Sequence, residues 1–333
     1  MKIVLVFRKQ RAGAYSIETL FRTIAQELCK NAEIVEYETG PRWKLLMDAW
    51  RLWKMRADVY HVTGDVQYFI MFLPRDKSVL TVPDIGHYQN GLRGVKRFIY
   101  KWLWLILPIR MAKVVTTISR NTLERIRIDL GIKLKGIVVN NCCYNHIFLR
   151  TQKEFDLEKP VILQVGTQPN KNLDRVIEAI KEIRCRLLII GPLDQNTVHK
   201  LNESAIEYEN HKNLTIEEVF KHYTRADIMC FVSTYEGFGM PIIEANAVGL
   251  PVVTSNIPPM SDVAGDSACL VNPFDTKAIR DGILQVIHDP AYRKKLVESG
   301  FSNAERYSPA IVALQYFSLY HSVAKRVYFS TQI

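Results

Sequence analysis

Short apolar runs alternate with amphipathic stretches along the chain. In the first half the runs fall at residues 2–7, 58–63, 78–82 and 113–118, and stretches with helical spacing, such as residues 16–29, separate them. A second series follows the charged segment at residues 151–160 and contains the runs VILQVG, RLLIIG, DIMCFVS, PVVTS and ACLV. Apolar runs separated by helices are typical of parallel sheets that are covered on both faces. The pattern therefore predicts an α/β chain with two parallel sheets.

The two series predict two Rossmann-like domains, at residues 1–150 and 151–310, joined by a linker near residues 151–159. A length of 333 residues fits two domains, and 48% hydrophobic with 23% charged residues is an ordinary globular composition. Ligands of such sheets bind at the carboxyl ends of the strands. We therefore expect the active site in a cleft between the two domains.

One turn in the second domain has the chemistry of a phosphate site. In residues 233–256, STYEGFGMPIIEANAVGLPVVTSN, an apolar strand leads through a GFGMP turn into a helix. Gly237 and Gly239 permit backbone angles and close approaches that a side chain would block. The amides of Phe238 to Met240 would then point at the ligand. A helix N-terminus with such amides is a ready anion site, which predicts a bound phosphate group.

Two glutamates flank this turn. Glu236 precedes it, and Glu244 lies within the following helix, so both are placed to accept hydrogen bonds from sugar or ribose hydroxyls. Two glutamates eight residues apart also occur by chance, as a loop charge and an exposed helix residue. The apolar neighbours of Glu244 argue against a purely solvated position. Together with the anion site, the pair predicts a nucleotide sugar as the ligand.

A second phosphate candidate follows the strand VILQV. The sequence VGTQPNKNLDRVIEAI, residues 165–180, places Gly166 and Thr167 in a short loop and Lys171 at the start of a helix. There the ammonium group of Lys171 can neutralise a diphosphate. The alternative is an exposed lysine at a helix start, which is common.

The first strand is followed by a basic loop, residues 8–21, with the sequence RKQRAGAYSIETLF. Gly13 is the candidate position for a close approach of this backbone to the donor, and Ser16 is a candidate helix cap. No G-x-G-x-x-G sequence is present, which argues against a dinucleotide-dependent oxidoreductase.

The net charge of +10 belongs to the first half of the chain. Residues 1–150 hold 25 Lys and Arg against 12 Asp and Glu, whereas residues 151–333 hold 19 against 22. Six scattered cysteines without CxxC spacing predict reduced thiols, not a disulfide or zinc framework. Met1 and Lys2 lead directly into the first apolar run, so no signal peptide is expected and a cytoplasmic location is predicted.

Two basic, aromatic segments account for much of this charge. Trp43, Leu46, Trp50 and Trp53 share one helical stripe among basic residues, and residues 96–110, KRFIYKWLWLILPIR, join an apolar run to four basic residues. The run is far shorter than the ~20 residues that a membrane-spanning helix needs. Basic helices with Trp on the apolar side bind anionic membrane surfaces, whereas burial of these tryptophans in the core is the alternative. The sequence favours a peripheral position at the inner face of the membrane and, without a recognised motif, no nucleic acid partner.

Residues 233–256 resemble the donor-binding segment of the retaining glycosyltransferases of family 4, also called group 1, which have the GT-B fold. The matching motif is E-x7-E, from Glu236 to Glu244, followed by GLPVVTSN. The resemblance implies that Glu236 approaches the donor sugar, that Glu244 binds the ribose of the nucleotide and that the turn amides hold the diphosphate. It also implies that a C-terminal helix at residues 311–333 packs back on the first domain.

The first domain departs from the family pattern after the strand SVLTV. The family often has a His-Asp pair there, but in this chain Pro83 precedes Asp84. The role of the missing histidine near the transferred sugar can pass to His87 or to His61, which we expect to face the same cleft. For each of these histidines a structural role is an equally good interpretation.

The phosphate loop departs as well. Members of the family usually have Arg-Lys at this point, and Lys171 matches the lysine, but Asn170 occupies the place of the arginine. One of two expected cations is therefore missing. The resemblance implies weaker donor binding or a substitute residue elsewhere.

The sequence predicts a metal-independent, hexosyltransferase-type enzyme that moves a sugar from a nucleotide diphosphate sugar to a glycan or lipid-linked acceptor. The resemblance implies retention of configuration. The basic, aromatic helices favour a role in cell-surface polysaccharide synthesis. No cofactor, metal or protein nucleophile is expected beyond the donor substrate, and the chain lacks an Asp-x-Asp sequence. The alternatives are a nucleotide-sugar epimerase or phosphorylase on the same fold, and a non-catalytic nucleotide-sugar binder.

Overall fold

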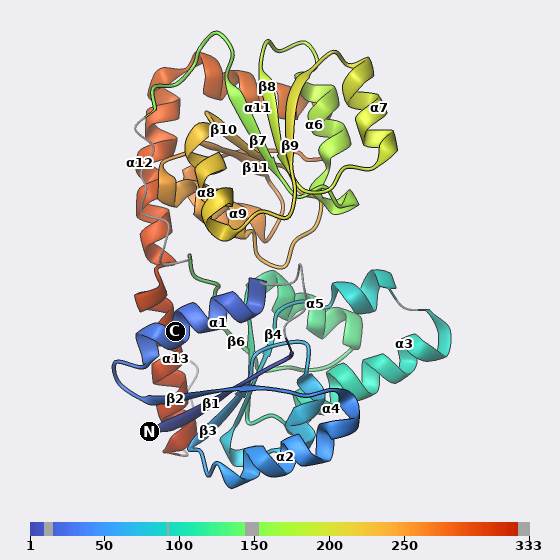
Figure 1. The fold of residues 1–333 in the computed structure, drawn as a ribbon, viewed down its shortest axis with the longest axis vertical. Coiled ribbons are helices and arrows are strands. Elements are labelled where there is room, and N and C mark those ends of the chain that lie inside the picture. The colour runs from blue at the N-terminus through green and yellow to red at the C-terminus, as the bar shows by residue number, and fades with distance from the viewer. Residues whose placement is uncertain (10–15, 92, 144–152, 326–333) are drawn as a thin grey trace. The chain divides into compact units, whose positions relative to one another are not determined.

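A computed structural model describes residues 1–9, 16–91, 93–143 and 153–325 of the chain. The chain divides into two compact units, of which the first combines Met1–Cys142 with the segment from Pro309 onward and the second is Cys143–Ser308. In each unit, helices cover a six-stranded parallel sheet (Figure 1). The predicted α/β class with two Rossmann-like domains is confirmed. Gly13 lies outside the described residues.

The first unit has the strand order β2-β1-β3-β4-β5-β6. Its strands are β1 (Lys2–Phe7), β2 (Glu33–Glu38), β3 (Val59–Val62), β4 (Ser78–Val82), β5 (Val114–Thr117) and β6 (Ile137–Val138). Its α-helices are α1 (Ser16–Leu28), α2 (Leu45–Lys54), α3 (Gly94–Tyr100), α4 (Leu107–Met111), α5 (Arg120–Leu130) and α13 (Pro309–Ala324). Its 3₁₀ and π-helical segments are η1 (Arg42–Lys44), η2 (Gln67–Phe72), η3 (Arg75–Lys77), η4 (His87–Gly91) and η5 (Lys101–Ile106).

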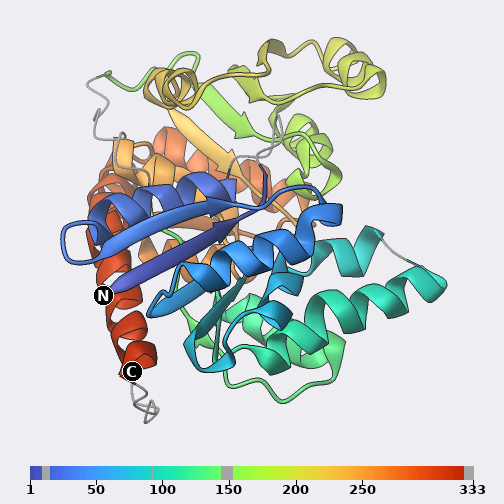
Figure 2. The same ribbon diagram turned by 60° about the horizontal axis from the view of Figure 1, so that its bottom comes forward.

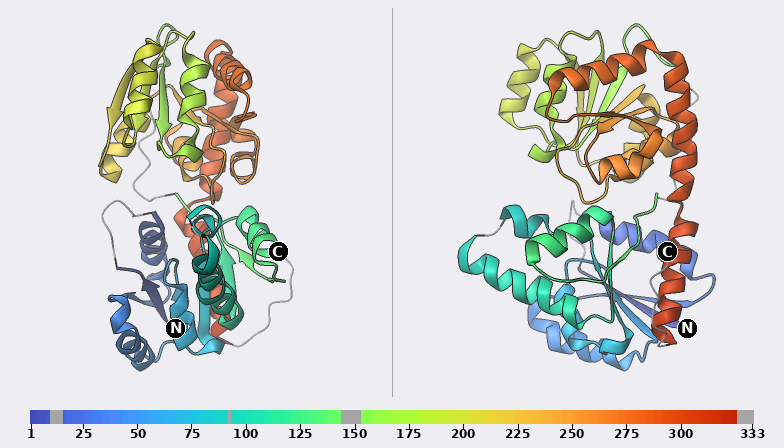
Figure 3. Two further views of the ribbon diagram at one scale, coloured as in Figure 1. Left: turned by 90° about the vertical axis from the view of Figure 1, so that its right-hand side faces the viewer. Right: turned by 180° about the vertical axis from the view of Figure 1, so that it is seen from behind.

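The alternation of side chains along β1 divides the core of this unit into two layers. Ile3, Leu5 and Phe7 pack against α1 and α13, whereas Val4 and Val6 face the layer that contains α2, η2, α4 and α5. Helices α1 and α13 lie side by side (Figure 3). On the other face, α2 and the α3–η5–α4 stretch can be followed in Figure 2 by their blue and teal colours.

His61 lies in the first of these layers, so the expectation that it faces a cleft is wrong. Its side chain is fully buried, and its ring nitrogens contact Tyr320 Oη on α13 (2.6 Å) and Thr81 Oγ1 on β4 (2.7 Å). Burial lowers the pKa of His61 to about 3, so the imidazole is neutral. His61 is therefore a hydrogen-bonded core residue that ties α13 to the sheet.

The second unit has the strand order β12-β11-β10-β7-β8-β9. Its strands are β7 (Val161–Val165), β8 (Arg186–Ile190), β9 (Glu207–His211), β10 (Ile228–Phe231), β11 (Val252–Ser255) and β12 (Ala268–Val271). Its helices are α6 (Leu173–Ile180), α7 (Gln195–Glu203), α8 (Ile216–Arg225), α9 (Met240–Val248), α10 (Met260–Ala264), α11 (Thr276–His288) and α12 (Pro290–Arg306), with short turns η6 (Pro169–Lys171) and η7 (Gly265–Ser267).

A buried polar cluster fixes α9 against α12. Asn246 Oδ1 accepts hydrogen bonds from Asn303 Nδ2 (2.9 Å) and Ser267 Oγ (2.8 Å). Gly300 allows the close approach, since a Cβ there would lie 3.0 Å from Asn246 Nδ2. Because buried amides are costly to leave unpaired, this cluster sets the position of α9 on the sheet.

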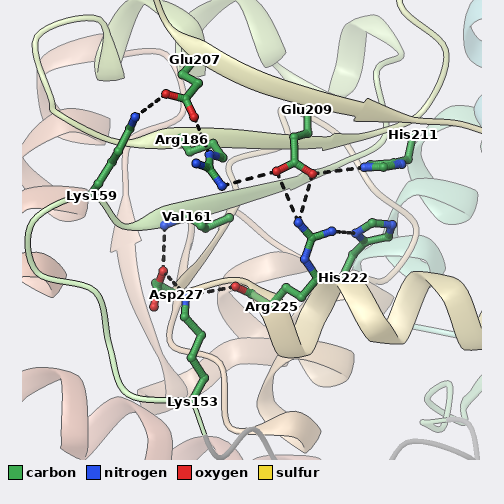
Figure 4. A network of polar contacts seen from close by, with 10 residues as sticks. All are labelled: Lys153, Lys159, Val161, Arg186, Glu207, Glu209, His211, His222, Arg225 and Asp227. Carbon is green, nitrogen blue, oxygen red and sulfur yellow. Dashed lines mark hydrogen bonds and ion pairs between the residues drawn. The ribbon is translucent and has the colours of Figure 1, made fainter.

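Strands β2 and β9 lack the apolar runs that predicted the other strands, and β6 is only two residues long. The sequence EYENH of β9 is polar because it lies at the edge of the sheet, where charged side chains form a network (Figure 4). Glu207 Oε1 accepts a hydrogen bond from Arg186 Nε (2.7 Å), and Glu209 Oε2 accepts one from Arg225 Nη2 (3.1 Å). Edge strands of this kind are not found from hydrophobic periodicity alone.

Candidate active site

The sheet of the second unit reverses its strand order between β7 and β10. These two strands are hydrogen-bonded neighbours, but the chain runs outward from β7 to β8 and β9, and in the opposite direction from β10 to β11 and β12. The loops that leave the carboxyl ends of β7 and β10 therefore flank a topological switch point, where parallel sheets bind their ligands. Both predicted phosphate loops begin at this point.

Lys171 and Glu236 meet between these loops. Lys171 Nζ lies 2.6 Å from Glu236 Oε1, and the two side chains are only 17% and 15% exposed. Lys171 Nζ also lies 4.8 Å from the centre of the Phe231 ring, a distance typical of a cation–π contact. The cationic and anionic groups that the sequence assigned to one site are thus in direct contact.

The backbone of the β7 loop is shaped to admit the Lys171 side chain. Gly166 has φ +86°, and a Cβ at this position would lie 2.9 Å from Lys171 Cε. Gln164, which is buried at the end of β7, donates from Nε2 to the carbonyl oxygen of Lys171 (3.0 Å). Thr167 is turned to the β8 side of the loop, where its hydroxyl donates to the Pro192 carbonyl (2.5 Å).

Asn170 joins the two loops. Its side-chain amide donates to the Tyr235 carbonyl (2.9 Å), with a longer contact to Glu236 Oε1 (3.4 Å). Its own carbonyl accepts the amide of Thr234 (2.8 Å). The residue that stands in place of a second cation therefore holds the Glu236 loop beside the Lys171 loop.

Helix α9 begins at the GFGMP turn with Met240. Gly239 precedes it with φ +119°, a conformation that strongly favours glycine. Phe238 is buried and packs edge-on against Tyr307, with ring centres 5.6 Å apart, which anchors the turn. Since amides in the first turn of a helix have no intrahelical acceptor, the start of α9 presents donors and a partial positive charge.

Glu244 lies in the second turn of α9 and is only 8% exposed. Tyr223 on α8 donates its hydroxyl to Glu244 Oε2 at 2.6 Å. Burial raises the pKa of Glu244 to about 7, although the Tyr223 hydrogen bond and the charge of Lys171 lower it. The carboxyl is therefore held in one orientation and titrates near neutral pH. The interpretation of Glu244 as an exposed helix residue is wrong.

Asp84 and His87 both follow β4 in the first unit. Asp84 lies at the surface of the unit. Its Oδ1 accepts a hydrogen bond from the amide of Gly86 at 2.8 Å. Partial removal of the carboxyl from water raises the pKa of Asp84, and the charge of Asp65 adds to the effect. The His87 ring lies 5.3 Å from that of Tyr100, edge to face. These two candidates thus lie in the segment that follows β4, Asp84 ahead of η4 and His87 at its start.

Sequence reasoning missed several residues that shape these sites. At the switch point between β1 and β3, Arg8 forms ion pairs with Glu18 and Asp65. Glu18 is buried, so this cluster fixes a charged group close to the loop after β1. The position of Arg8 directly after the first strand could have indicated this cluster. For Tyr223 no signal was available, because its partner Glu244 lies 21 residues away on another helix.

The basic, aromatic helices of the first unit are at its surface. Trp43, Trp50 and Trp53 are 79%, 55% and 64% exposed, so their interpretation as core residues is wrong. Phe98, Trp102 and Leu103 on α3 and η5 are exposed too. None of the described helices is long and apolar enough to cross a bilayer. In the described parts of the chain, no three His, Cys, Asp or Glu side chains are grouped so that they could hold a metal ion.

Comparison with known proteins identifies the family. The model of the glycosyl transferases group 1 family matches residues 146–302. The chain is 32% identical over 303 residues to the O-antigen chain mannosyltransferase B of Escherichia coli, covering 80% of this chain and 77% of that protein. It is also 28% identical over 169 residues to the capsular polysaccharide biosynthesis glycosyltransferase CapM of Staphylococcus aureus, with 47% and 44% covered.

The fold agrees with this family. A solved structure of Anabaena Alr3699/HepE in complex with UDP and glucose superposes with a TM-score of 0.77 at 15% identity, over 97% of this chain and 100% of that one. The fold is therefore that of the GT-B glycosyltransferases, as the resemblance implied. The relatives favour neither an epimerase or phosphorylase nor a non-catalytic binder. The chain belongs to the group 1 glycosyltransferases and is a glycosyltransferase.

Proposed function

We propose that this enzyme transfers a sugar from a nucleotide diphosphate sugar to its acceptor with retention of anomeric configuration. The observation that carries the proposal is the contact of Lys171 with Glu236 beside the start of α9. In this arrangement Lys171 and the amides of Phe238 to Met240 hold the diphosphate, and Glu236 accepts hydroxyls of the donor sugar. Glu244 accepts the ribose hydroxyls.

We assign the remaining donor contacts from the shape of the two loops. Gly166 and Thr167 bring the β7 backbone close to the diphosphate, and Gly237 and Gly239 do the same for the α9 turn. Gly13 has the corresponding role in the first unit, by the sequence argument alone. Lys171 and the α9 amides supply the positive charge for the leaving diphosphate, so we expect turnover without a metal ion. Strong loss of turnover in a chelator would contradict this expectation.

Asp84 and His87 are our candidates for the acceptor side of the reaction. Both lie in the segment after β4, and burial of the Asp84 carboxyl raises its pKa. We propose that they orient the acceptor hydroxyl and the transferred sugar. Orientation of reactants lowers the barrier without a covalent intermediate.

The acceptor is a glycan or a lipid-linked glycan of cell-surface polysaccharide synthesis in this proposal. Two relatives are named for O-antigen and capsular polysaccharide assembly, and α2 and η5 present exposed tryptophans among basic residues. We propose that these helices hold the enzyme peripherally at the inner, anionic face of the membrane. Flotation with phosphatidylglycerol vesicles should carry the enzyme upward, whereas phosphatidylcholine vesicles should not. Equal flotation with both kinds of vesicle would contradict the proposal that the negative charge of the membrane attracts the enzyme.

A donor screen tests the proposal at its centre. We expect one or more of the UDP, GDP, ADP and dTDP sugars to raise the melting temperature of the wild-type enzyme. Glu244→Ala should remove the shift, because the ribose loses its acceptor, whereas Glu305→Ala on the exposed face of α12 should retain it. A shift that survives Glu244→Ala would overturn the ribose assignment. Donor conversion in the absence of any acceptor would favour an epimerase.

A further inference from the structure

A small apolar pocket opens in the first unit between α2, η2 and η5. Its volume is about 200 Å³, and its lining is apolar. The residues that line it are Leu45, Tyr68, Met71, Phe72, Leu103 and Trp104. A sugar or nucleotide needs hydrogen-bonding partners, which such walls do not offer. The lining selects a hydrocarbon group.

Two of the elements that line the pocket contain basic residues, with Arg51 and Lys54 on α2 and Lys101 on η5. Helix α2 contains one carboxylate, Asp48, which is buried and accepts hydrogen bonds from Tyr37 Oη (2.7 Å) and Gly40 N (2.8 Å). The stretch from α3 to α4 contains no Asp or Glu at all. Lys54 lies 3.7 Å from the Trp50 ring centre on α2. The ligand that complements this surface therefore combines a hydrocarbon chain with an anionic group.

A chain of aromatic contacts leads from the pocket to the acceptor-side loop. Trp104, a wall of the pocket, is stacked on Tyr100 with ring centres 5.8 Å apart and planes 12° from parallel. Tyr100 in turn lies 5.3 Å from His87. Both steps lie within the first unit. Two ring contacts thus separate the apolar pocket from a residue that we place beside the acceptor.

We propose that this pocket binds the hydrocarbon chain of an anionic, lipid-linked acceptor, whose polar head is then directed to Asp84 and His87. The inference rests on the proposed function, since it names the acceptor class of that reaction. A chain of a bilayer lipid would suit the same walls. The ring contacts from Trp104 through Tyr100 to His87 favour the acceptor as the ligand. The acceptor must reach the reacting groups, whereas a bilayer lipid does not take part in the reaction.

Binding is tested with dodecyl phosphate below its micellar concentration, with butyl phosphate as the short-chain comparison. We expect one saturable site for dodecyl phosphate by calorimetry and no binding of butyl phosphate. Met71→Gln in the pocket wall should weaken binding by about tenfold or more, because a polar group replaces apolar contact. Met47→Gln, an exposed position on α2 outside the pocket, is the matched control. Equal affinities of these two variants would overturn the pocket assignment.

Two further measurements keep the test independent of folding defects. The half-exposed position Leu103 provides a second variant, Leu103→Gln, which should repeat the effect of Met71→Gln. A chain brominated at its end, 12-bromododecyl phosphate, should quench tryptophan fluorescence in the wild type and markedly less in Trp104→Phe, since bromine quenches on contact. Undiminished quenching in Trp104→Phe would place the chain on the exposed tryptophans instead.

The acceptor assignment is tested by transfer to glycosides with a methyl or a dodecyl aglycone. Met71→Gln should raise KM for the dodecyl acceptor and leave KM for the methyl acceptor unchanged. An unchanged KM for both, with dodecyl phosphate binding lost, would assign the pocket to a bilayer lipid and overturn our inference. Thermal shifts with nucleotide sugars report separately on the donor site. If no donor binds, the proposed function fails, and the acceptor assignment fails with it, whatever the affinity for dodecyl phosphate.

Discussion

Lys171 Nζ and Glu236 Oε1 lie 2.6 Å apart although 65 positions separate them in the sequence. The contact arises because β7 and β10 are neighbours in the sheet and each sends its next loop across the same edge. In the structure the Glu236 carboxylate neutralises the Lys171 ammonium group. Under the proposed function a donor diphosphate competes with Glu236 for Lys171, so substitutions of the two residues should have opposite effects on diphosphate binding.

Replacement of Lys171 by Met should weaken nucleoside diphosphate binding and lower kcat/KM by about 10²–10³-fold, because a preorganised positive charge at the leaving group is lost. Steady-state kinetics and calorimetry with the donor found in the screen measure both effects. Lys181→Met, at an exposed lysine just after α6, is the control and should change neither. Wild-type turnover in Lys171→Met would remove this residue from the catalytic site.

Replacement of Glu236 by Gln should have a mixed effect. The free nucleoside diphosphate should bind two- to tenfold more tightly, about 0.4–1.4 kcal/mol, because Lys171 is no longer neutralised. Transfer should nevertheless fall, since the amide is a weaker acceptor for the hydroxyls of the sugar. Calorimetry with the diphosphate alone separates the two effects from each other. Weaker diphosphate binding in Glu236→Gln would show that the pair does not compete with the ligand.

Glu244→Gln should stabilise the enzyme at alkaline pH while it weakens donor binding, because the amide is a weaker acceptor than the carboxylate. The carboxyl has a folded pKa of about 7 and an ordinary value of 4.5, so the folded state binds more protons between these values. The free energy of unfolding therefore falls as pH rises through this window, and the cost is complete above pH 7. Removal of the charge should raise the free energy of unfolding by about 1–3 kcal/mol at pH 8. The measurement is a denaturant titration at pH 4.5 and pH 8, and an equal effect at both values would contradict the burial argument.

Gly239→Ala should impair donor binding more than the addition of a single methyl group suggests. The residue has φ +119°, and a Cβ there would lie 3.1 Å from Ile242 Cδ1. A side chain in this conformation costs about 1–3 kcal/mol, and the turn amides would shift to relieve it. Donor affinity and melting temperature should both fall. Gly265→Ala, at φ +50° with open space around the Cβ, is a control for backbone strain alone, and it should leave donor affinity intact.

His87→Phe tests the acceptor side. The phenyl ring can keep the edge-to-face contact with Tyr100 but cannot hydrogen-bond, so stability should change little. If His87 orients the transferred sugar or the acceptor, kcat should fall by about tenfold or more while donor affinity stays constant. Single-turnover kinetics with saturating donor measure the chemical step. Unchanged kcat would leave His87 with the structural role of an aromatic contact.

Much of the candidate site could be predicted from local sequence. The apolar runs predicted β7 and β10, and the GFGMP turn predicted the start of α9, because glycine conformations and helix starts depend on nearby residues. The family resemblance placed the two glutamates in one site. Asn170, by contrast, was interpreted only as a missing cation, and its bridge between the loops depends on a contact with Tyr235.

The sequence by itself determined the alternation of strands and helices, the two α/β halves and the residue types of an anion site with carboxylates, since each follows from a local pattern. Only the tertiary structure decided which of these residues touch. The neighbouring positions of β7 and β10 joined Lys171 to Glu236, and packing of α8 beside α9 placed Tyr223 on the Glu244 carboxyl. Long-range packing also buried His61 under α13 and left the tryptophans of α2 exposed. Local patterns fix the elements, whereas burial and partner choice depend on contacts between elements that are far apart in sequence.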